Sequence, residues 1–238
     1  MIGRVILFLQ QRTYSMKKYI LIMAGGEGTR FDAEMPKQFA LLEKRPVIMH
    51  TFDAFNQVED AEFILVLNEH WQEQWKIMCK EHSFKTPHTL VTGGETRFHS
   101  VLAGLQKVIN PSIVAIHDAA RPLVSEKLIE NCFRVAETKS CAIPVIPISD
   151  SIRYVSGPHN KAVDREQYRA VQTPQVFKSN LILQAYRQSY DEKFTDDASV
   201  LGSLGYPVIL VAGETENIKI THPIDIQIAA LLLQHRKK

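Results

Sequence analysis

The stretch YILIMAGGEGTR (residues 19–30) joins an apolar run to a turn rich in glycine. The run predicts a buried β-strand, and glycines directly after a strand expose backbone N–H groups that can hold a phosphate. Further apolar runs, such as FILVLN (63–68) and SIVAIHD (112–118), alternate with amphipathic stretches along the chain. This alternation predicts an α/β fold with a largely parallel sheet.

The composition limits the classes of partner. The chain has 238 residues, of which 45% are hydrophobic and 23% charged, as in ordinary globular enzymes. A net charge of +2 gives no bulk electrostatic reason to expect nucleic acid or an anionic membrane, so important basic residues must act locally. No apolar run reaches the length of a membrane span. The three cysteines form no CxxC motif, which indicates reduced thiols filling the core of a cytoplasmic protein.

The first residues need a separate interpretation. Arg4 followed by VILFL mimics a signal peptide, but the apolar stretch is too short and no small-residue cleavage site follows. Met16, before two lysines and an apolar strand, resembles a natural start. We interpret residues 1–15 as a disordered upstream extension, the alternative being a short added strand or helix. Residues 17–238 are expected to form a single domain.

One segment of that domain differs from the rest. Between Ser149 and Phe177 the chain has β-type residues on both sides of Gly157-Pro158. This pattern predicts a hairpin-like arm at about residues 150–172, projecting from the main sheet. Arg165 on the arm would normally face solvent, unless the arm crosses to another subunit and delivers this arginine to the site there.

The glycine turn at residues 24–30 could belong to three kinds of nucleotide site. A Walker A loop ends in Gly-Lys-Ser/Thr, and that ending is absent. A dinucleotide fingerprint would need glycine where Phe31 stands and an acid where Asn68 follows the second strand. The third possibility is a loop whose backbone N–H groups face a triphosphate and whose last residue, Arg30, supplies a fixed positive charge. The alternative is a tight turn that uses glycines only for positive φ.

Two further segments suit a phosphate site. Lys37 follows Pro36, which fixes the backbone, and lies within reach of the glycine loop, so we expect it to neutralise phosphate oxygens. HDAARP (117–122) ends a predicted strand, where α/β folds present their chemistry. There Asp118 is an oxygen ligand suited to Mg²⁺. We expect His117 to hydrogen-bond rather than bind metal, whereas Arg121 either reaches a phosphate or pins the loop.

The remaining candidates are weaker when taken singly. In GGETRFHSV (93–101), the glycines with Arg97 and Ser100 can form a wall for a planar base. Prolines at positions 144 and 147 place the strand CAIPVIPI at an edge or a bend. Thr195 can cap a helix that begins in TDDAS, and Lys219 is expected in a short strand before a helix that opens with proline.

Taken together, the motifs resemble one enzyme family. The resemblance is carried, in this order, by AGGEGTRF (24–31), PKQF (36–39), GGETRFHSV (93–101), HDAARP (117–122), VDREQYRAVQTPQVF (163–177), TDDAS (195–199) and NIKITHP (217–223). This set is similar to that of 2-C-methyl-D-erythritol 4-phosphate cytidylyltransferases of the non-mevalonate isoprenoid pathway. The resemblance covers the chain from Lys17 to its end. The glycine loop and HDAARP alone are shared with related sugar nucleotidyltransferases.

The resemblance implies a Rossmann-like nucleotidyltransferase sheet with a protruding β-arm, a homodimer formed through that arm, and Mg²⁺, or another divalent ion, as cofactor. The implied reaction is transfer of CMP from CTP to 2-C-methyl-D-erythritol 4-phosphate with release of pyrophosphate. The implied catalytic residues are Arg30, Lys37, Arg165 and Lys219. The nucleotide would be held by Ala24, Gly25, Gly26, Gly28, Gly94, Ser100 and Asp118, with Asp118 also holding the metal. The second substrate would be bound by Ser151, Arg165, Thr173, Thr195 and Lys219.

Two other functions remain open on the sequence. A ribitol 5-phosphate cytidylyltransferase would share the loop, the HDA-type strand and the TPQ segment, although an arginine on the arm and TDDAS favour the methylerythritol enzyme. A non-catalytic nucleotide-binding regulator could keep the fold without the reaction. Ser151 stands where the family more often has threonine, and Glu95 stands where aspartate is common.

Overall fold

The computed structural model describes residues 16–25 and 35–236. Gly26, Gly28, Arg30 and the expected extension at residues 1–15 therefore lie outside the described residues.

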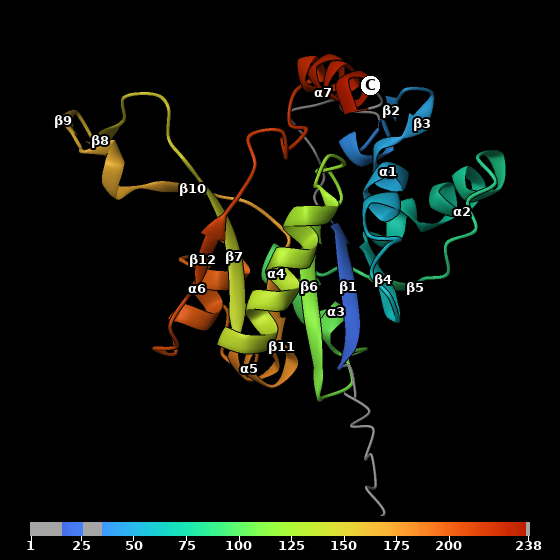
Figure 1. Ribbon diagram of the computed structural model, residues 1–238, viewed down its shortest axis with the longest axis horizontal. Helices are drawn as coiled ribbons and strands as arrows, with labels where there is room; N and C mark the ends of the chain where they lie inside the picture. The colour runs from blue at the N-terminus through green and yellow to red at the C-terminus, as the bar shows by residue number, and fades with distance from the viewer. Residues whose placement is uncertain (1–15, 26–34, 237–238) are drawn as a thin grey trace, which may run out of the picture.

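The centre of the molecule is a mixed sheet with the order β10-β7-β11-β6-β1-β4-β5, in which β12 also pairs with β7 (Figure 1). Four neighbouring strands run parallel, namely β1 (Lys17–Ala24), β4 (Ala61–Leu67), β5 (Thr89–Thr92) and β6 (Ser112–Asp118). The other half comprises β7 (Cys141–Pro147), β10 (Arg169–Val171), β11 (Gln175–Lys178) and β12 (Leu210–Ala212). The predicted α/β architecture is confirmed.

Helices cover both faces of this sheet because its strands are apolar on both sides. Along β1, Ile20 and Ile22 pack into one core cluster, whereas Tyr19 and Leu21 pack into the other. The first cluster includes side chains of α1 (Val47–Ala54), α2 (Gln72–Glu81) and α4 (Glu126–Lys139). The second includes those of α3 (Arg97–Leu105), α5 (Ser179–Ala185) and α6 (Asp197–Gly202). Figure 1 shows α4 in front of the sheet and α3 behind it.

The smaller elements lie around this three-layered body. Short 3-10 helices η1 (Lys37–Phe39), η2 (Glu69–Trp71) and η3 (Arg165–Gln167) occur in connecting segments. A two-stranded ribbon pairs β2 (Leu41–Leu42) with β3 (Arg45–Pro46), and the last helix is α7 (Pro223–Arg236). Cys132 and Cys141 are buried, in agreement with their predicted role as core residues. Across the described ranges, no helix has both the length and the apolar character needed to cross a membrane.

The predicted arm is present. It carries the hairpin of β8 (Arg153–Ser156) and β9 (His159–Ala162), whose residues are all exposed. Gly157 in its turn has a φ of 56°, which glycine adopts without strain. Figure 1 shows the hairpin projecting well clear of the central sheet.

The prolines were predicted to place β7 at an edge or a bend, and the prediction of an edge strand was wrong. The strand has neighbours on both sides, with β10 and β11 on one and β12 on the other. Pro144 is tolerated because its missing N–H falls where β10 gives way to β11 and the register with β7 changes. Its carbonyl still accepts a hydrogen bond from Gln172 N at 2.8 Å.

Two local predictions also require correction. Thr195 does not cap α6, because Asp196 does so in a capping box, in which its side chain accepts from Ser199 N at 2.8 Å. Lys219 does not lie in a strand. Its segment is instead tied to the end of β6 through Ile220 N, which donates to Ala120 O at 2.8 Å. By contrast, Ser125 caps α4 as predicted, accepting from Leu128 N at 3.0 Å.

Candidate active site

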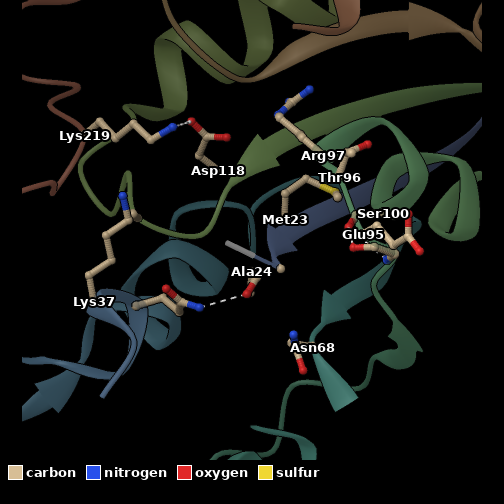
Figure 2. A pocket seen from close by; sticks show the side chains of 14 residues that line it. Met23, Ala24, Lys37, Asn68, Glu95, Thr96, Arg97, Ser100, Asp118 and Lys219 are labelled. Atoms are coloured by element: carbon tan, nitrogen blue, oxygen red, sulfur yellow. Dashed lines mark hydrogen bonds and ion pairs between the residues drawn. The ribbon is translucent and has the colours of Figure 1, made fainter. Parts of the chain in front are cut away.

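A cavity of about 490 Å³ opens where the parallel strands end. Its walls come from residues at or just after the carboxyl ends of four strands, together with residues of η1, α3 and the segment before α7. They are Met23, Ala24, Gly25, Lys37, Gln38, Asn68, Gly94, Glu95, Thr96, Arg97, Ser100, Asp118, Ala120 and Lys219. Figure 2 shows Lys37, Asp118 and Lys219 toward one end of this cavity and Glu95, Thr96 and Ser100 toward the other.

The PKQF segment is anchored to the end of β1. Gln38 is only 3% exposed, and its Nε2 donates to Ala24 O at 2.8 Å. This hydrogen bond fixes η1 against the strand, and Lys37 at the start of η1 reaches the cavity. Gln38 was not among the predicted site residues. The sequence offered only a weak indication of this role, namely that Gln38 is a polar residue between Lys37 and the apolar Phe39.

Asp118 lies at the same end of the cavity as Lys37 and Lys219 (Figure 2). Its Oδ2 lies 2.9 Å from Lys219 Nζ and 3.5 Å from Arg121 Nε. Burial by itself would raise the pKa of Asp118, but the positive charges of Lys219, Arg97 and Arg121 outweigh burial and hold this pKa well below its usual range. Asp118 is therefore an ionised carboxylate between two cations, and Lys219 is held in place by it.

Glycine and serine form the opposite end of the cavity. Gly94 N donates to Ser100 Oγ at 3.1 Å, and Ser100 Oγ donates to Gly94 O at 3.2 Å. A Cβ at Gly94 would lie 2.5 Å from that of His99, and one at Gly25 would lie 3.1 Å from Ser100 Oγ. The wall therefore depends on bare backbone at two strand ends, which suits the flat face of a base.

Arg97 lines the cavity but has a structural partner. Its two terminal nitrogens donate to the carboxylate of Asp197 at 2.7 and 2.6 Å. Asp197 is fully buried and also accepts from Tyr186 Oη at 2.6 Å. This bidentate pair ties α3 to the TDDAS segment. No local pattern in the sequence indicates the pair, because its members are far apart in the chain.

Behind Asp118 lies a buried polar network. His117 Nε2 is 3.0 Å from Arg121 O, and Thr173 Oγ1 is 3.1 Å from His117 Nδ1 and accepts from Asp118 N at 3.1 Å. Burial lowers the pKa of His117 to about 4, so the imidazole is neutral. The prediction that His117 serves hydrogen bonding is confirmed. Arg121 pins the loop, since its Nη1 donates to Asn217 O at 2.7 Å.

Four predicted substrate-binding residues do not line the cavity: Ser151, Arg165, Thr173 and Thr195. Ser151 and Thr195 are exposed, and Thr173 is only 5% exposed. Arg165 lies on the arm, where it donates to Ser149 O and its Nε is 3.5 Å from Glu166 Oε1. Within one chain, the cavity thus combines Lys37, Asp118 and Lys219 without the arm.

The donor set determines what metal the cavity could hold. Among the residues that the structure describes, no group of three or more His, Cys, Asp or Glu side chains could form a metal cage. Mg²⁺ is commonly held by only one or two carboxylates, with substrate phosphates and waters completing its shell. The ionised Asp118 fits that mode of binding.

The chain is similar to known proteins over most of its length. Residues 19–235 match the family model described as IspD: 2-C-methyl-D-erythritol 4-phosphate cytidylyltransferase. A protein of that name from Bacteroides thetaiotaomicron is 44% identical over 92% of this chain and 100% of its own length. One from Porphyromonas gingivalis is 48% identical over 91% of this chain and 98% of its own length.

Solved structures agree with the sequence comparison. The crystal structure of 2-C-methyl-D-erythritol 4-phosphate cytidylyltransferase from Thermus thermophilus has a TM-score of 0.72 at 32% identity, covering 92% of this chain and 99% of that one. The crystal structure of the enzyme of the same name from Francisella tularensis has a TM-score of 0.76 at 26% identity, covering 90% of this chain and 99% of that one.

Proposed function

Because the chain belongs to the 2-C-methyl-D-erythritol 4-phosphate cytidylyltransferase family, we propose that it transfers CMP from CTP to 2-C-methyl-D-erythritol 4-phosphate. The products would be 4-diphosphocytidyl-2-C-methyl-D-erythritol and pyrophosphate. The observation that carries this proposal is the division of one cavity into a charged end with Lys37, Asp118 and Lys219 and a backbone-lined end with Gly94 and Ser100. The first end suits a triphosphate and the second suits a base.

The reaction needs positioning and charge stabilisation more than acid–base chemistry. A phosphate monoester is already a nucleophile, so the enzyme must bring two polyanions together and stabilise an in-line transition state. Lys37 and Lys219 would supply positive charge at the phosphorus that is attacked, and we assign the same role to Arg30. Asp118 would hold Mg²⁺, or another divalent ion, whose contribution when bound is to neutralise the triphosphate.

We further propose that the enzyme acts as a homodimer, with the acceptor site completed by the arm of the partner subunit. The support is that Arg165 and Ser151 lie on or beside an exposed arm, away from the cavity of their own chain. Tyr154 and Val155 on the hairpin are 57% and 67% exposed, which suits a surface that another subunit covers. Thr195 and Lys219 would bind the acceptor phosphate.

We also propose a cytoplasmic location. It is supported by the three cysteines, which are free in the structure.

Pyrophosphate release from CTP tests the proposed reaction. The purified chain with Mg²⁺ should release pyrophosphate with 2-C-methyl-D-erythritol 4-phosphate and far more slowly with ribitol 5-phosphate or without acceptor. Lys219→Ala should lose at least about a hundredfold in kcat/KM, whereas Lys107→Ala, at an exposed lysine outside the cavity, should match the wild type. A preference for ribitol 5-phosphate would overturn the proposal, and so would CTP binding without turnover.

A further inference from the structure

The hydroxyl of Thr173 contacts two buried groups of the protein, His117 Nδ1 and Asp118 N. His117 Nε2 faces the carbonyl oxygen of Arg121 at 3.0 Å, and because a carbonyl can only accept, Nε2 carries the hydrogen. His117 is fully buried, and its other ring nitrogen, Nδ1, faces Thr173. Thr173 Oγ1 lies 3.1 Å from His117 Nδ1 and accepts from Asp118 N at 3.1 Å, so both of these hydrogen-bond contacts are with protein groups.

This arrangement leaves Thr173 unsuited to bind a phosphate. A phosphate would have to compete with two existing contacts of the hydroxyl, to His117 Nδ1 and to Asp118 N. The side chain is also 5% exposed and does not line the cavity. Its hydrogen bond acts instead on the backbone of Asp118, the residue whose carboxylate pairs with Lys219.

We propose that His117 and Thr173 are positioning residues, which hold the backbone of Asp118 so that its carboxylate stays beside Lys219, and that Thr173 does not touch the acceptor. This inference rests on the proposed function. It assigns a role to His117, and it replaces the substrate-binding role that the family resemblance implied for Thr173.

Further hydrogen bonds hold the backbone on both sides of Lys219. Asn217 is fully buried, and its Nδ2 donates to Thr173 O at 2.8 Å, while Arg121 donates to its backbone carbonyl. On the other side of Lys219, Ile220 N donates to Ala120 O at 2.8 Å. Hydrogen bonds thus connect the HDAARP, QTPQ and NIKIT segments into one polar network, and both members of the Asp118–Lys219 pair belong to these segments.

Substitutions of Thr173 separate positioning from direct binding. Thr173→Val keeps the shape of the side chain but removes the hydroxyl, and should lower kcat by about 10- to 100-fold, as is typical for groups that orient a metal ligand. The KM for the acceptor should stay the same, and the dissociation constant of CTP with Mg²⁺, measured by calorimetry, should rise. Thr173→Ser keeps the hydroxyl and should restore both kcat and the dissociation constant of CTP.

A matched control is provided by Ser179, at the other end of the β6–β11 pair. Its buried hydroxyl accepts from Ser112 N at 2.9 Å and donates to Asn110 Oδ1 at 2.7 Å, as Thr173 does with Asp118 and His117. Ser179→Ala should lower the melting temperature but leave kcat unchanged. An equal fall in kcat in Ser179→Ala and Thr173→Val would show that only general stability is lost.

His117 is tested by a double-mutant cycle. His117→Phe keeps a ring that can pack on Phe55, whose centroid lies 4.9 Å from that of the imidazole, but removes both hydrogen bonds. If the pair acts as a unit, adding His117→Phe to Thr173→Val should cost little beyond the worse single variant. Additive losses would contradict coupling, and a raised acceptor KM with unchanged kcat in Thr173→Val would show direct binding.

One measurement can be made without CTP or the acceptor. The amide of Asp118 loses its acceptor in Thr173→Val, so its hydrogen exchange, followed by NMR, should become faster and return to the wild-type rate in Thr173→Ser. An unchanged exchange rate would overturn the inference even if the wild type transfers CMP as proposed. Conversely, faster exchange in a protein that does not transfer CMP would leave the positioning inference intact and reject the proposed function.

Discussion

At the scale of single residues, Asp118 is the focus of the candidate site. Its side chain is only 12% exposed and lies among Lys219, Arg121 and Arg97, whose positive charges stabilise its ionised form. Among the described lining residues, Asp118 is the only carboxylate at the end of the cavity with Lys37 and Lys219, since Glu95 lies at the other end (Figure 2). We therefore expect a cation bound to the triphosphate to use Asp118.

Asp118→Asn keeps the size of this side chain but removes its charge. We expect kcat to fall by about a hundredfold or more, because Lys219 loses its partner and the divalent ion loses a ligand. The concentration of Mg²⁺ needed for half-maximal activity should rise as well. The control is Asp60→Asn at an exposed turn before β4, which should behave as the wild type. Unchanged Mg²⁺ dependence in Asp118→Asn would contradict the assigned role.

A second residue-scale prediction concerns the bare backbone at Gly94. A methyl group in Gly94→Ala would meet the Cβ of His99 at 2.5 Å, so the turn has to shift. We expect a loss of about 1–3 kcal/mol in the free energy of unfolding and a higher KM for CTP. In the control Gly202→Ala, the added Cβ would make an ordinary 3.5 Å contact with Val208. Equal CTP affinity in wild type and Gly94→Ala would exclude this wall from the base site.

At the scale of elements, the start of α6 separates a structural residue from an adjacent functional candidate. Asp196 caps the helix and accepts from Gln175 Nε2 at 2.8 Å, while the neighbouring Thr195 is exposed. Asp196→Ala should reduce the free energy of unfolding by about 1–2 kcal/mol, as measured by urea denaturation. Thr195→Ala should leave stability unchanged and raise the KM for the acceptor. A larger loss of stability in Thr195→Ala would reverse these assignments.

The elements also show what the sequence could predict. Strand β6 and its last residue were predicted correctly, because an apolar run ending in HD is a purely local pattern. The start of helix α4 was also predicted correctly, because Ser125 is a local capping signal. By contrast, β7 was misplaced because its second neighbour, β12, comes from residues far along the chain. Asp118, Lys37 and Lys219 were predictable as candidates since each lies in a distinctive motif.

The partners of these residues were not predictable. Thr173 contacts His117 and Asp118 only because β11 pairs antiparallel with β6. Arg97 at the start of α3 contacts Asp197 at the start of α6 only because the fold brings these two helices together. Gln38 has no distinguishing feature apart from its motif. Long-range contacts of this kind depend on the tertiary fold, so a sequence pattern can indicate which residues carry chemistry but not which residues position them.

At the scale of the whole molecule, the role proposed for the arm requires the protein to form a dimer. The hairpin residues are all exposed, and Arg165 lies outside the cavity of its own chain. Arg165→Ala should therefore raise the KM for the acceptor much more than the KM for CTP. Equal effects on the two substrates would contradict this placement of the arm.

Mixed dimers test the same idea without relying on KM values. A dimer of one Arg165→Ala chain and one Lys219→Ala chain would contain one complete site if the arm acts on the partner subunit. Co-expressed or subunit-exchanged variants should then recover at most about a quarter of the wild-type sites, whereas each variant alone should have a much lower kcat/KM for the acceptor than the mixture. Mixtures without any recovered activity would place Arg165 in the site of its own chain.

A crystal structure with CTP and Mg²⁺ tests the central claim most directly. We predict that the cytosine lies against Gly94 and Ser100 and that the triphosphate lies within hydrogen-bonding distance of Lys37, with the metal bound to Asp118. A nucleotide that lies in the opposite orientation, or binds outside this cavity, would contradict the account.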